Sequence, residues 1–477
     1  MKGWFVMNTP FVHFLETHND IYLFDVNTNM ISKVNERIYK YFSGQGKKED
    51  LESEDLLIIN NMKNMGMLCA NQIERIEHPM SNLIEDILEN SLNRLTIQVT
   101  QNCNFRCEYC VYSGSYHNRV HNNKRMDWDT AKCALDFLEQ HSRNAPEINV
   151  SFYGGEPLLE MDLIRHCVDY SHKIFNRKKV SFNLTTNASL LTDEVIKYFE
   201  KEKFLVTISL DGPQEIHDKN RTFADGKRGT YVTVIDRIKR IKEIAPDFCA
   251  NVTINAVLDD ENNFSLINQY FANEPVIKDI YVSTNYVNDT NRKEKIEQSN
   301  QANYIEICNE KFIALMYLMK RVSRDSVSKL VVREVADINE TVGKRKISRK
   351  VTPSITHPGG PCLPGVQRPF VNAYGKLYPC ERVNETCEEM CIGNIYDGFN
   401  LESVKRLLNI GKITEESCKK CWAFNFCTQC GVTADNGKKM VPEQRLEKCG
   451  AVRNHVDNLL KDYIVLKECG CDFTQRL

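Results

Sequence analysis

Cysteine is the residue that most constrains what this chain can fold into. The sequence has 19 cysteines among 477 residues, three of them between Cys103 and Cys110 and eleven between Cys362 and Cys471. Disulfides do not persist in a reducing compartment, so clustered thiols indicate metal sites. The five isolated cysteines fit small buried hydrophobic residues instead: Cys69, Cys133, Cys167, Cys249 and Cys308.

Composition and charge exclude several other classes of protein. Hydrophobic residues make up 42% of the chain and charged residues 26%, as in a folded soluble protein rather than a disordered or fibrous one. The formal net charge of −2 provides no global positive field for nucleic acid. No apolar run approaches the ~20 residues of a membrane span, and the N-terminus lacks a signal peptide's apolar core. We therefore expect a cytoplasmic protein that binds neither nucleic acid nor membrane.

The middle of the chain, residues 93–290, alternates between strand-like and helix-like segments. This alternation over ~200 residues predicts a parallel sheet with right-handed crossovers, an α/β fold. Six strands are too few for an eight-stranded barrel, so we expect an open, partial (β/α)6 barrel with its ligands at the carboxyl ends of the strands. The expected strands are 95–100, 148–152, 180–185, 204–210, 252–257 and 280–283.

A small module precedes this region. Residues 1–80 contain two short strand-like runs, 11–16 and 21–26, with Asn-rich turn material between and after them, followed by helical stretches at 36–42 and 56–65. These patterns predict an α+β, winged-helix-like module. It has no catalytic motif of its own.

Two further segments follow the barrel region. Residues 291–351 are expected to form a helical bridge, helical from 295 to 340, and a basic linker. Residues 352–477 are expected to form a Cys-rich domain. The basic run is interpreted as a solvated linker rather than a peptide-binding patch: Lys344, Arg345, Lys346, Arg349 and Lys350.

The first cysteine group has the pattern Cys103-x3-Cys107-x2-Cys110 and begins three residues after the first expected strand. A cubane iron–sulfur cluster takes one ligand per iron, so three thiolates leave one iron free to hold another molecule. Structural zinc is the competing interpretation, but it needs four protein ligands. No fourth Cys or His lies at a zinc-like spacing from this group, and His117 is a poorly placed candidate for the fourth ligand.

The stretch TQNCNFRCEYC resembles the cluster-binding signature of the radical S-adenosylmethionine (radical SAM) enzymes, including an aromatic residue, Tyr109, before the last cysteine. After the second expected strand, the segment YGGEP resembles the GGEP segment of the same family. The resemblance implies that Gly154, Gly155 and Glu156 hold the methionine ammonium group of S-adenosylmethionine. Glycines permit close backbone approach and a carboxylate suits a cation.

Three more residues match cofactor-contacting positions of that family. Asn187 follows the third expected strand and Ser209 ends the fourth; in relatives such positions contact the ribose or the carboxylate. Arg221 matches an arginine that pairs with the methionine carboxylate through its two-pronged guanidinium group. All of these positions lie at successive strand ends, so they predict one small-molecule site.

The C-terminal cysteines resemble the SPASM extension of radical SAM enzymes, with the last pair spaced by two residues rather than three. Paired C-x2-C elements also suit zinc. The resemblance implies two auxiliary clusters, one complete and one with an iron that either Cys387, Cys391 or the substrate fills. Cys469 and Cys471 are expected in a disordered tail. The complete set is Cys418, Cys421, Cys427 and Cys449; the incomplete set is Cys362, Cys380 and Cys430.

The resemblance extends to function. It implies three [4Fe-4S] clusters, bound S-adenosylmethionine, reduction by a flavodoxin or ferredoxin, and a 5′-deoxyadenosyl radical that removes hydrogen from an unactivated C–H bond. The N-terminal module resembles the PqqD-like domains that bind a precursor's leader peptide as an added strand. We therefore expect a peptide maturase that forms thioether crosslinks between Cys and an acceptor residue in a Cys-rich precursor.

Other functions remain open from the sequence. Formylglycine formation on a sulfatase and carbon–carbon crosslinking are the alternative SPASM reactions, and a zinc-stapled peptide-binding scaffold is the non-enzyme alternative. No residue of the sequence is identified as a catalytic general base.

Overall fold

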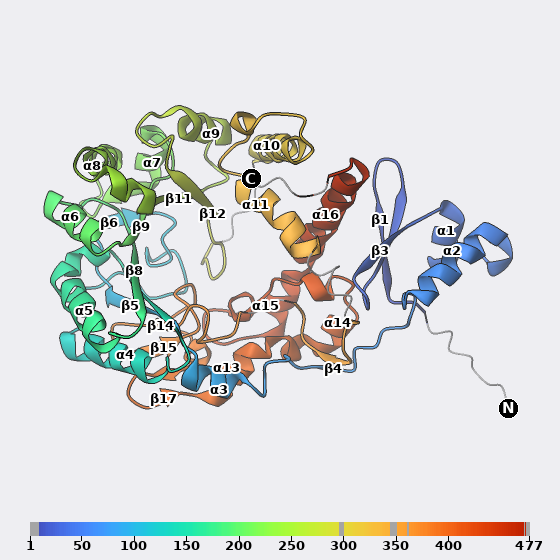
Figure 1. The fold of residues 1–477 in the computed structure, drawn as a ribbon, viewed down its shortest axis with the longest axis horizontal. Coiled ribbons are helices and arrows are strands. Elements are labelled where there is room, and N and C mark those ends of the chain that lie inside the picture. The colour runs from blue at the N-terminus through green and yellow to red at the C-terminus, as the bar shows by residue number, and fades with distance from the viewer. Residues whose placement is uncertain (1–8, 295–299, 344–350, 360–361, 472, 474–477) are drawn as a thin grey trace.

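A computed structural model describes residues 9–294, 300–343, 351–359, 362–471 and 473. The basic run at 344–350 lies outside these residues. Figure 1 shows a curved sheet with helices on its outer side, the N-terminal module at the opposite end, and the Cys-rich domain beneath both. No helix within the described ranges is both long and apolar enough to cross a membrane.

Six parallel strands form the barrel and confirm the prediction of an open α/β barrel. Their spatial order is β12-β11-β9-β8-β7-β5, so each crossover returns to a neighbouring position and the sheet does not close. Each predicted strand is present, within a few residues of its expected ends. The strands are β5 (Arg94–Thr100), β7 (Glu147–Gly154), β8 (Lys179–Thr186), β9 (Leu205–Ser209), β11 (Val252–Leu258) and β12 (Tyr281–Tyr286).

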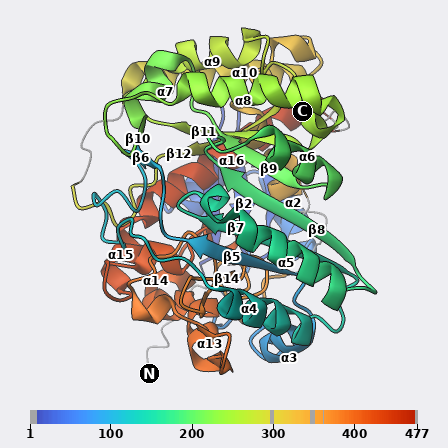
Figure 2. The ribbon, with the colours of Figure 1, turned by 90° about the vertical axis from the view of Figure 1, so that its left-hand side faces the viewer.

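Amphipathic helices cover the outer face of this sheet (Figure 2). In β11, the buried residues Val252, Ile254, Ala256 and Leu258 alternate with less buried ones, because successive side chains of a strand point to opposite faces. Each helix packs its apolar side against the buried face of the sheet. They are α4 (Trp128–Gln140), α5 (Met161–Ile174), α6 (Asp193–Lys201), α7 (Gln214–Asn220), α8 (Tyr231–Ile244) and α9 (Phe264–Asn273).

The barrel sheet continues into the Cys-rich domain. Strand β14 (Phe370–Val371) pairs in parallel with β5. It is followed in the same sheet by three antiparallel strands, β15 (Lys376–Tyr378), β16 (Gly393–Asn394) and β17 (Gly398–Phe399). The cysteines of the C-terminal domain are therefore attached to a rigid extension of the barrel.

The N-terminal module is a three-stranded antiparallel sheet with two helices. Its sheet order is β1-β2-β3, and it has a small hydrophobic core that includes Leu23, Ile38 and Met62. The third strand was absent from the sequence prediction. The elements are β1 (Val12–Glu16), β2 (Ile21–Asp25), β3 (Met30–Val34), α1 (Glu36–Phe42) and α2 (Ser53–Asn64).

This module docks on the Cys-rich domain. The His13 ring stacks on Trp422 with ring centroids 3.6 Å apart, and the Asn425 amide donates to the Val26 carbonyl oxygen at 2.8 Å. After the module, β4 (Arg75–Ile76) pairs with β13 (Ile355–Thr356). The segment that follows the module is therefore part of the Cys-rich domain's framework.

Within the expected bridge, two helices, Gln301–Leu318 and Val332–Ile338, are separated by residues that are not α-helical. Cys471, predicted in a disordered tail, is buried, and its thiol lies 3.5 Å from the Leu318 carbonyl oxygen. Of the isolated cysteines, Cys167 is buried as predicted, whereas Cys69 and Cys308 are exposed. The remaining helices are α3 (Ile84–Asn90), α10 (Gln301–Leu318), α11 (Val332–Ile338), α13 (Leu401–Leu408), α14 (Glu415–Lys419), α15 (Pro442–Glu447) and α16 (Cys449–Glu468).

Candidate functional site

The first cysteine group lies in the loop after β5, at the carboxyl end of the barrel. Within this loop, β6 (Phe105–Cys107) pairs with β10 (Arg221–Phe223) in antiparallel register, and Arg221 stands directly opposite Cys107. Residues more than a hundred positions apart in the chain are thereby brought together. The arginine predicted from the sequence lies beside the cysteines.

Burial keeps the three thiols of this group protonated in the absence of metal. Burial raises the pKa of Cys107 to about 12, and it raises the pKa of Cys103 and Cys110 as well. Iron binding would replace these protons, because metal ligands must be thiolates. The nearby histidine is His121, whose Nε2 lies 3.6 Å from Cys110 Sγ, and not the predicted His117.

A buried charged network supports this group. Arg221 donates from Nε to Asp211 Oδ2 at 2.8 Å and from Nη2 to Oδ1 at 3.1 Å. The Tyr109 hydroxyl donates to the same carboxylate. Burial opposes the charge of Asp211, but Arg221 lowers its pKa overall. The guanidinium fork that the resemblance assigns to the methionine carboxylate is thus held by Asp211, and Nη1 lies 3.9 Å from Cys107 Sγ.

Glu156 is enclosed by donors from the next strand end. Its Oε1 accepts from Thr186 Oγ1 at 2.7 Å and Leu158 N at 3.0 Å, and its Oε2 accepts from Asn187 N at 2.8 Å. Burial raises its pKa to about 7. A carboxylate has about four acceptor positions, so one position remains for a ligand. Two of its three hydrogen bonds come from the end of β8, so Glu156 joins the ends of β7 and β8.

The two glycines before Glu156 are required by the chain's own packing. A Cβ on Gly154, which has φ of +151°, would lie 2.2 Å from the Thr100 carbonyl oxygen. A Cβ on Gly155 would lie 2.0 Å from the Asn102 oxygen and 2.9 Å from Cys103 Cβ. The backbone of Gly154 and Gly155 therefore packs closely against the end of β5 and the start of the cysteine loop.

Replacing Gly155 with Ala should therefore displace the cysteine loop. We expect loss of iron from the first group and a drop in cofactor cleavage on the order of a hundredfold, as for a misplacement of about 1 Å. Gly450→Ala is the matched control, because a Cβ there meets open space. Iron content and 5′-deoxyadenosine yield measure the effect; a Gly155→Ala protein with normal values would refute this role.

The two other predicted cofactor residues also lie at this end of the barrel. The Asn187 amide donates to Asn104 Oδ1 at 2.9 Å, which ties the end of β8 to the cysteine loop. Ser209 ends β9 and is 9% exposed. The end of β8 and strand β10 thus both contact the cysteine loop.

Four C-terminal cysteines line a single cavity of about 270 Å³. It lies between α14, α15 and the start of α16. The side chains of Gln429 and Arg445 also line it, and Gln429 Nε2 lies 3.4 Å from Cys449 Sγ. The four are the set predicted for the complete auxiliary cluster: Cys418, Cys421, Cys427 and Cys449.

For the other C-terminal set, burial raises the pKa of Cys362, and interactions with Cys380 and Cys430 raise it further. Cys387 is fully buried and its thiol lies 3.4 Å from the Lys438 carbonyl oxygen. The thiol of Cys391 lies 3.3 Å from the Gly393 oxygen.

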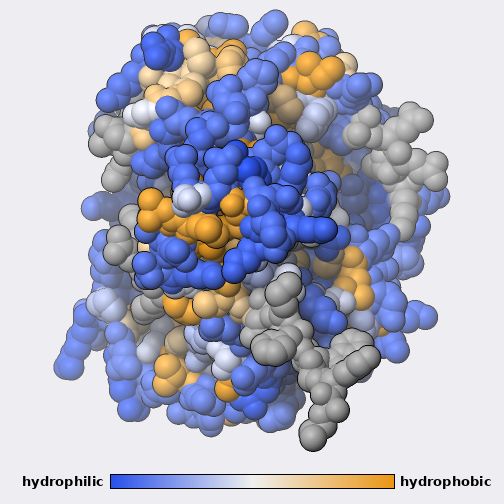
Figure 3. Space-filling view, turned by 90° about the vertical axis from the view of Figure 1, so that its right-hand side faces the viewer, coloured by the Kyte–Doolittle hydropathy of each residue, from blue (hydrophilic) through white to orange (hydrophobic). Residues whose placement is uncertain are grey.

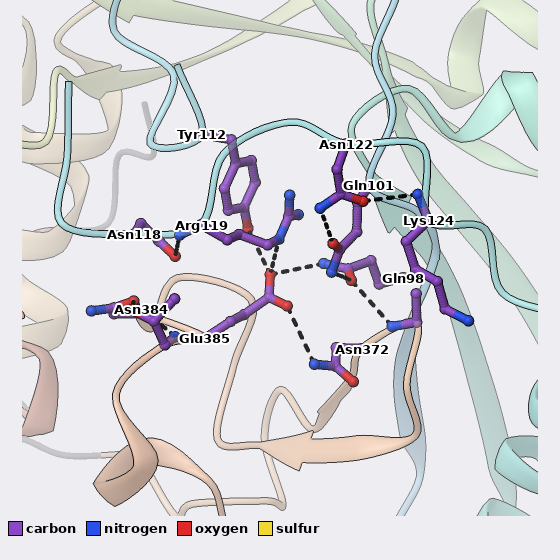
Figure 4. A network of polar contacts seen from close by, with 12 residues as sticks. Gln98, Gln101, Tyr112, Asn118, Arg119, Asn122, Lys124, Asn372, Asn384 and Glu385 are labelled. Carbon is purple, nitrogen blue, oxygen red and sulfur yellow. Dashed lines mark hydrogen bonds and ion pairs between the residues drawn. The ribbon is translucent and has the colours of Figure 1, made fainter. Parts of the chain in front are cut away.

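A polar network joins the first cysteine loop to the Cys-rich domain (Figure 4). The Glu385 carboxylate, 4% exposed, accepts from Arg119 Nε at 2.8 Å and from Gln98 Nε2 at 2.8 Å. The Arg119 guanidinium lies 3.6 Å from the centre of the Tyr112 ring. Removing either partner of a buried ion pair leaves an uncompensated charge, so the network holds the two cysteine regions in fixed relation.

The donor set of the first group suits an iron–sulfur cluster, because each protein ligand of a cubane binds a different iron and three thiolates leave one iron free. Cys103, Cys107 and Cys110 would hold the first cluster.

Comparison with known proteins agrees with this site. The Radical SAM superfamily family model matches residues 97–269. The chain is 31% identical over 169 residues to a cysteine-type anaerobic sulfatase-maturating enzyme of Clostridium novyi, covering 35% of this chain and 44% of that protein. It is 25% identical over 186 residues to the radical SAM cyclopropyl synthase TigE of Paramaledivibacter caminithermalis, covering 36% and 39%. The chain thus spans less than half the length of these relatives.

The fold also resembles a solved structure. Native anSMEcpe with bound AdoMet superposes with a TM-score of 0.57 and 20% identity, covering 78% of this chain and 99% of that one. Part of this chain therefore has no counterpart there. The sequence match, the open barrel and the cysteine loop at its carboxyl end identify residues 97–269 as a radical SAM domain homologous to those of the anaerobic sulfatase maturases and TigE.

Proposed function

We propose that this protein is a radical SAM peptide maturase that installs thioether crosslinks between Cys and an acceptor residue of a Cys-rich precursor. When bound, the reduced first cluster and S-adenosylmethionine would supply a radical able to take one hydrogen atom from the acceptor; the substrate Cys thiol would lose a proton, and an auxiliary cluster would be the acceptor for the remaining electron. The observation that carries the proposal is the pair of further cysteine groups on a domain whose sheet is continuous with the barrel.

The residues divide the work around the first cluster. Asp211 fixes Arg221 beside Cys107 and keeps it charged, so that a positive charge faces the cluster and the cofactor. Glu156 has one acceptor position left for the methionine ammonium group. The buried Glu385–Arg119 pair joins the first cysteine loop to the auxiliary region.

The incomplete auxiliary set would leave one iron open to a substrate thiolate, which is the reactive form of Cys. This is supported by Cys387 and Cys391, whose thiols contact backbone carbonyl oxygens. Cys387→Ala and Cys391→Ala should retain the iron content and activity of the unmodified protein. Loss of one cubane's iron in either variant would show that a protein thiol closes the site.

We assign the N-terminal module to recognition of a leader peptide. Within its sheet β3 pairs only with β2, and an edge strand can pair with an added peptide strand. Figure 3, which faces this side of the molecule, shows hydrophobic residues gathered among hydrophilic ones. On α2, Leu57 is 59% exposed, and just after the helix Met65 is 51% exposed, so the module offers apolar surface for such a peptide.

Formylglycine formation is the second candidate, because it is favoured by the match to a sulfatase-maturating enzyme. Mass spectrometry separates the two reactions. A thioether crosslink removes two hydrogens and retains the sulfur of the substrate Cys, whereas conversion of Cys to formylglycine removes the sulfur. Incubation of reconstituted protein with a Cys-rich precursor should give the first mass change; sulfur loss would favour the second reaction.

A further inference from the structure

Arg445 is among the largest fully buried side chains of the molecule, with 1% of its surface exposed. It lies on α15, and its Nε donates to Thr414 Oγ1 at 3.1 Å. Its Nη1 and Nη2 are buried and have no hydrogen-bond partner among the described residues. Burying an unpaired charge is costly, so these donors indicate a ligand that is anionic.

The surroundings of Arg445 identify the kind of ligand. Arg445 is one of the residues that line the cavity formed by Cys418, Cys421, Cys427 and Cys449. Burial raises the pKa of Cys427, and Arg445 counteracts this rise. The described lining residues include no carboxylate, and the only other charged one is Arg453, which is exposed.

His357 is a titratable group close to Arg445. Burial lowers its pKa to about 4, so it is neutral at pH 7 and adds no charge. Arg445 is therefore the one fully buried cation among the described residues of this cavity. A cubane bound by four thiolates carries net negative charge and offers sulfur acceptors on every side.

We propose that Arg445 donates hydrogen bonds from Nη1 and Nη2 to the sulfur atoms of the cluster held in this cavity and thereby raises its reduction potential. Hydrogen bonds to the sulfurs and net local charge set the potential of an iron–sulfur cluster. Reduction adds one electron to the cluster, and a buried cation stabilises the more negative state. The inference rests on the proposed cluster assignment. With Arg445 in place, this cluster would be a better electron acceptor than the same cluster without the arginine.

Redox titration of the full-length reconstituted protein, followed by EPR, tests the proposal. The signal of this cluster is identified by its loss in Cys449→Ala. In Arg445→Gln we expect the equilibrium constant for reduction to fall at least about tenfold, or about 59 mV for one electron. Arg453→Gln is the matched control: its charge lines the same cavity but is exposed, so its shift should be much smaller.

Arg445→Lys keeps a charge and loses the two-pronged donor. It should shift the potential in the same direction, less than Arg445→Gln and more than Arg453→Gln, and it serves as the test if Arg445→Gln does not load iron. A loaded Arg445 variant with the unmodified protein's potential would overturn the role of Arg445. Equal iron content in the unmodified protein and Cys449→Ala would instead overturn the cluster assignment itself.

Discussion

Replacing Cys103, Cys107 and Cys110 together with Ala will abolish cleavage of S-adenosylmethionine while leaving iron in the C-terminal domain. These three thiols lie in one loop at the carboxyl end of the barrel, beside Arg221. The C-terminal cysteines form separate groups, one of them around its own cavity. Iron analysis and 5′-deoxyadenosine yield under anaerobic conditions with dithionite measure the two effects.

The control for this variant uses cysteines outside the groups. Cys69→Ala and Cys308→Ala change exposed residues and should leave both measurements unaltered. Continued 5′-deoxyadenosine formation by the triple variant would exclude these thiols as ligands of the cluster that contacts the cofactor. Loss of all iron would mean that the three cysteine groups fold as one unit.

Deleting residues 1–71 should leave cofactor cleavage intact and reduce peptide modification at least about tenfold when the peptide is scarce, because a recognition module contributes binding energy and no reacting group. The cut is placed before β4 so that the pairing of β4 with β13 survives. The module has a small core of its own, and its residues Leu15, Phe24 and Val26 pack into the main hydrophobic core. Rates are measured as a function of precursor concentration, with iron content as the check on folding.

A second variant separates recognition from docking. His13→Ala keeps the module and removes the stacking of His13 on Trp422. Leader binding should therefore persist, while the contact between the module and the Cys-rich domain becomes weaker. If the truncated protein holds all its iron and modifies full-length precursor at the normal rate, the module has no recognition role.

The fold was largely predictable because its periodicity is local. Alternation of buried and less buried residues in β11, and the helical spacing in α5 and α8, come directly from the chain. Strand β3 was missed because MISKV is short and becomes a strand through pairing with β2. The continuation of the barrel through β14 depends on two residues meeting β5 across the fold, which no local pattern reveals.

The site divides in the same way. Cysteine spacing indicated the groups, and the order of the strand ends indicated that Glu156 and Asn187 would lie near one another, which they do. The sequence could not indicate that Arg221 is held by Asp211, nor that Arg445 lies fully buried against four cysteines. Both depend on tertiary contacts between residues whose individual types are common on any protein surface.

Transfer of deuterium from peptide to cofactor tests the central claim most directly. Reconstituted protein is incubated anaerobically with reductant, S-adenosylmethionine and a Cys-rich precursor whose acceptor residues carry deuterium on their side chains and α carbons. The proposed function predicts 5′-deoxyadenosine that contains deuterium, in step with a crosslinked peptide that keeps its sulfur. Crosslinked peptide accompanied by 5′-deoxyadenosine without deuterium, or no 5′-deoxyadenosine at all, would contradict it.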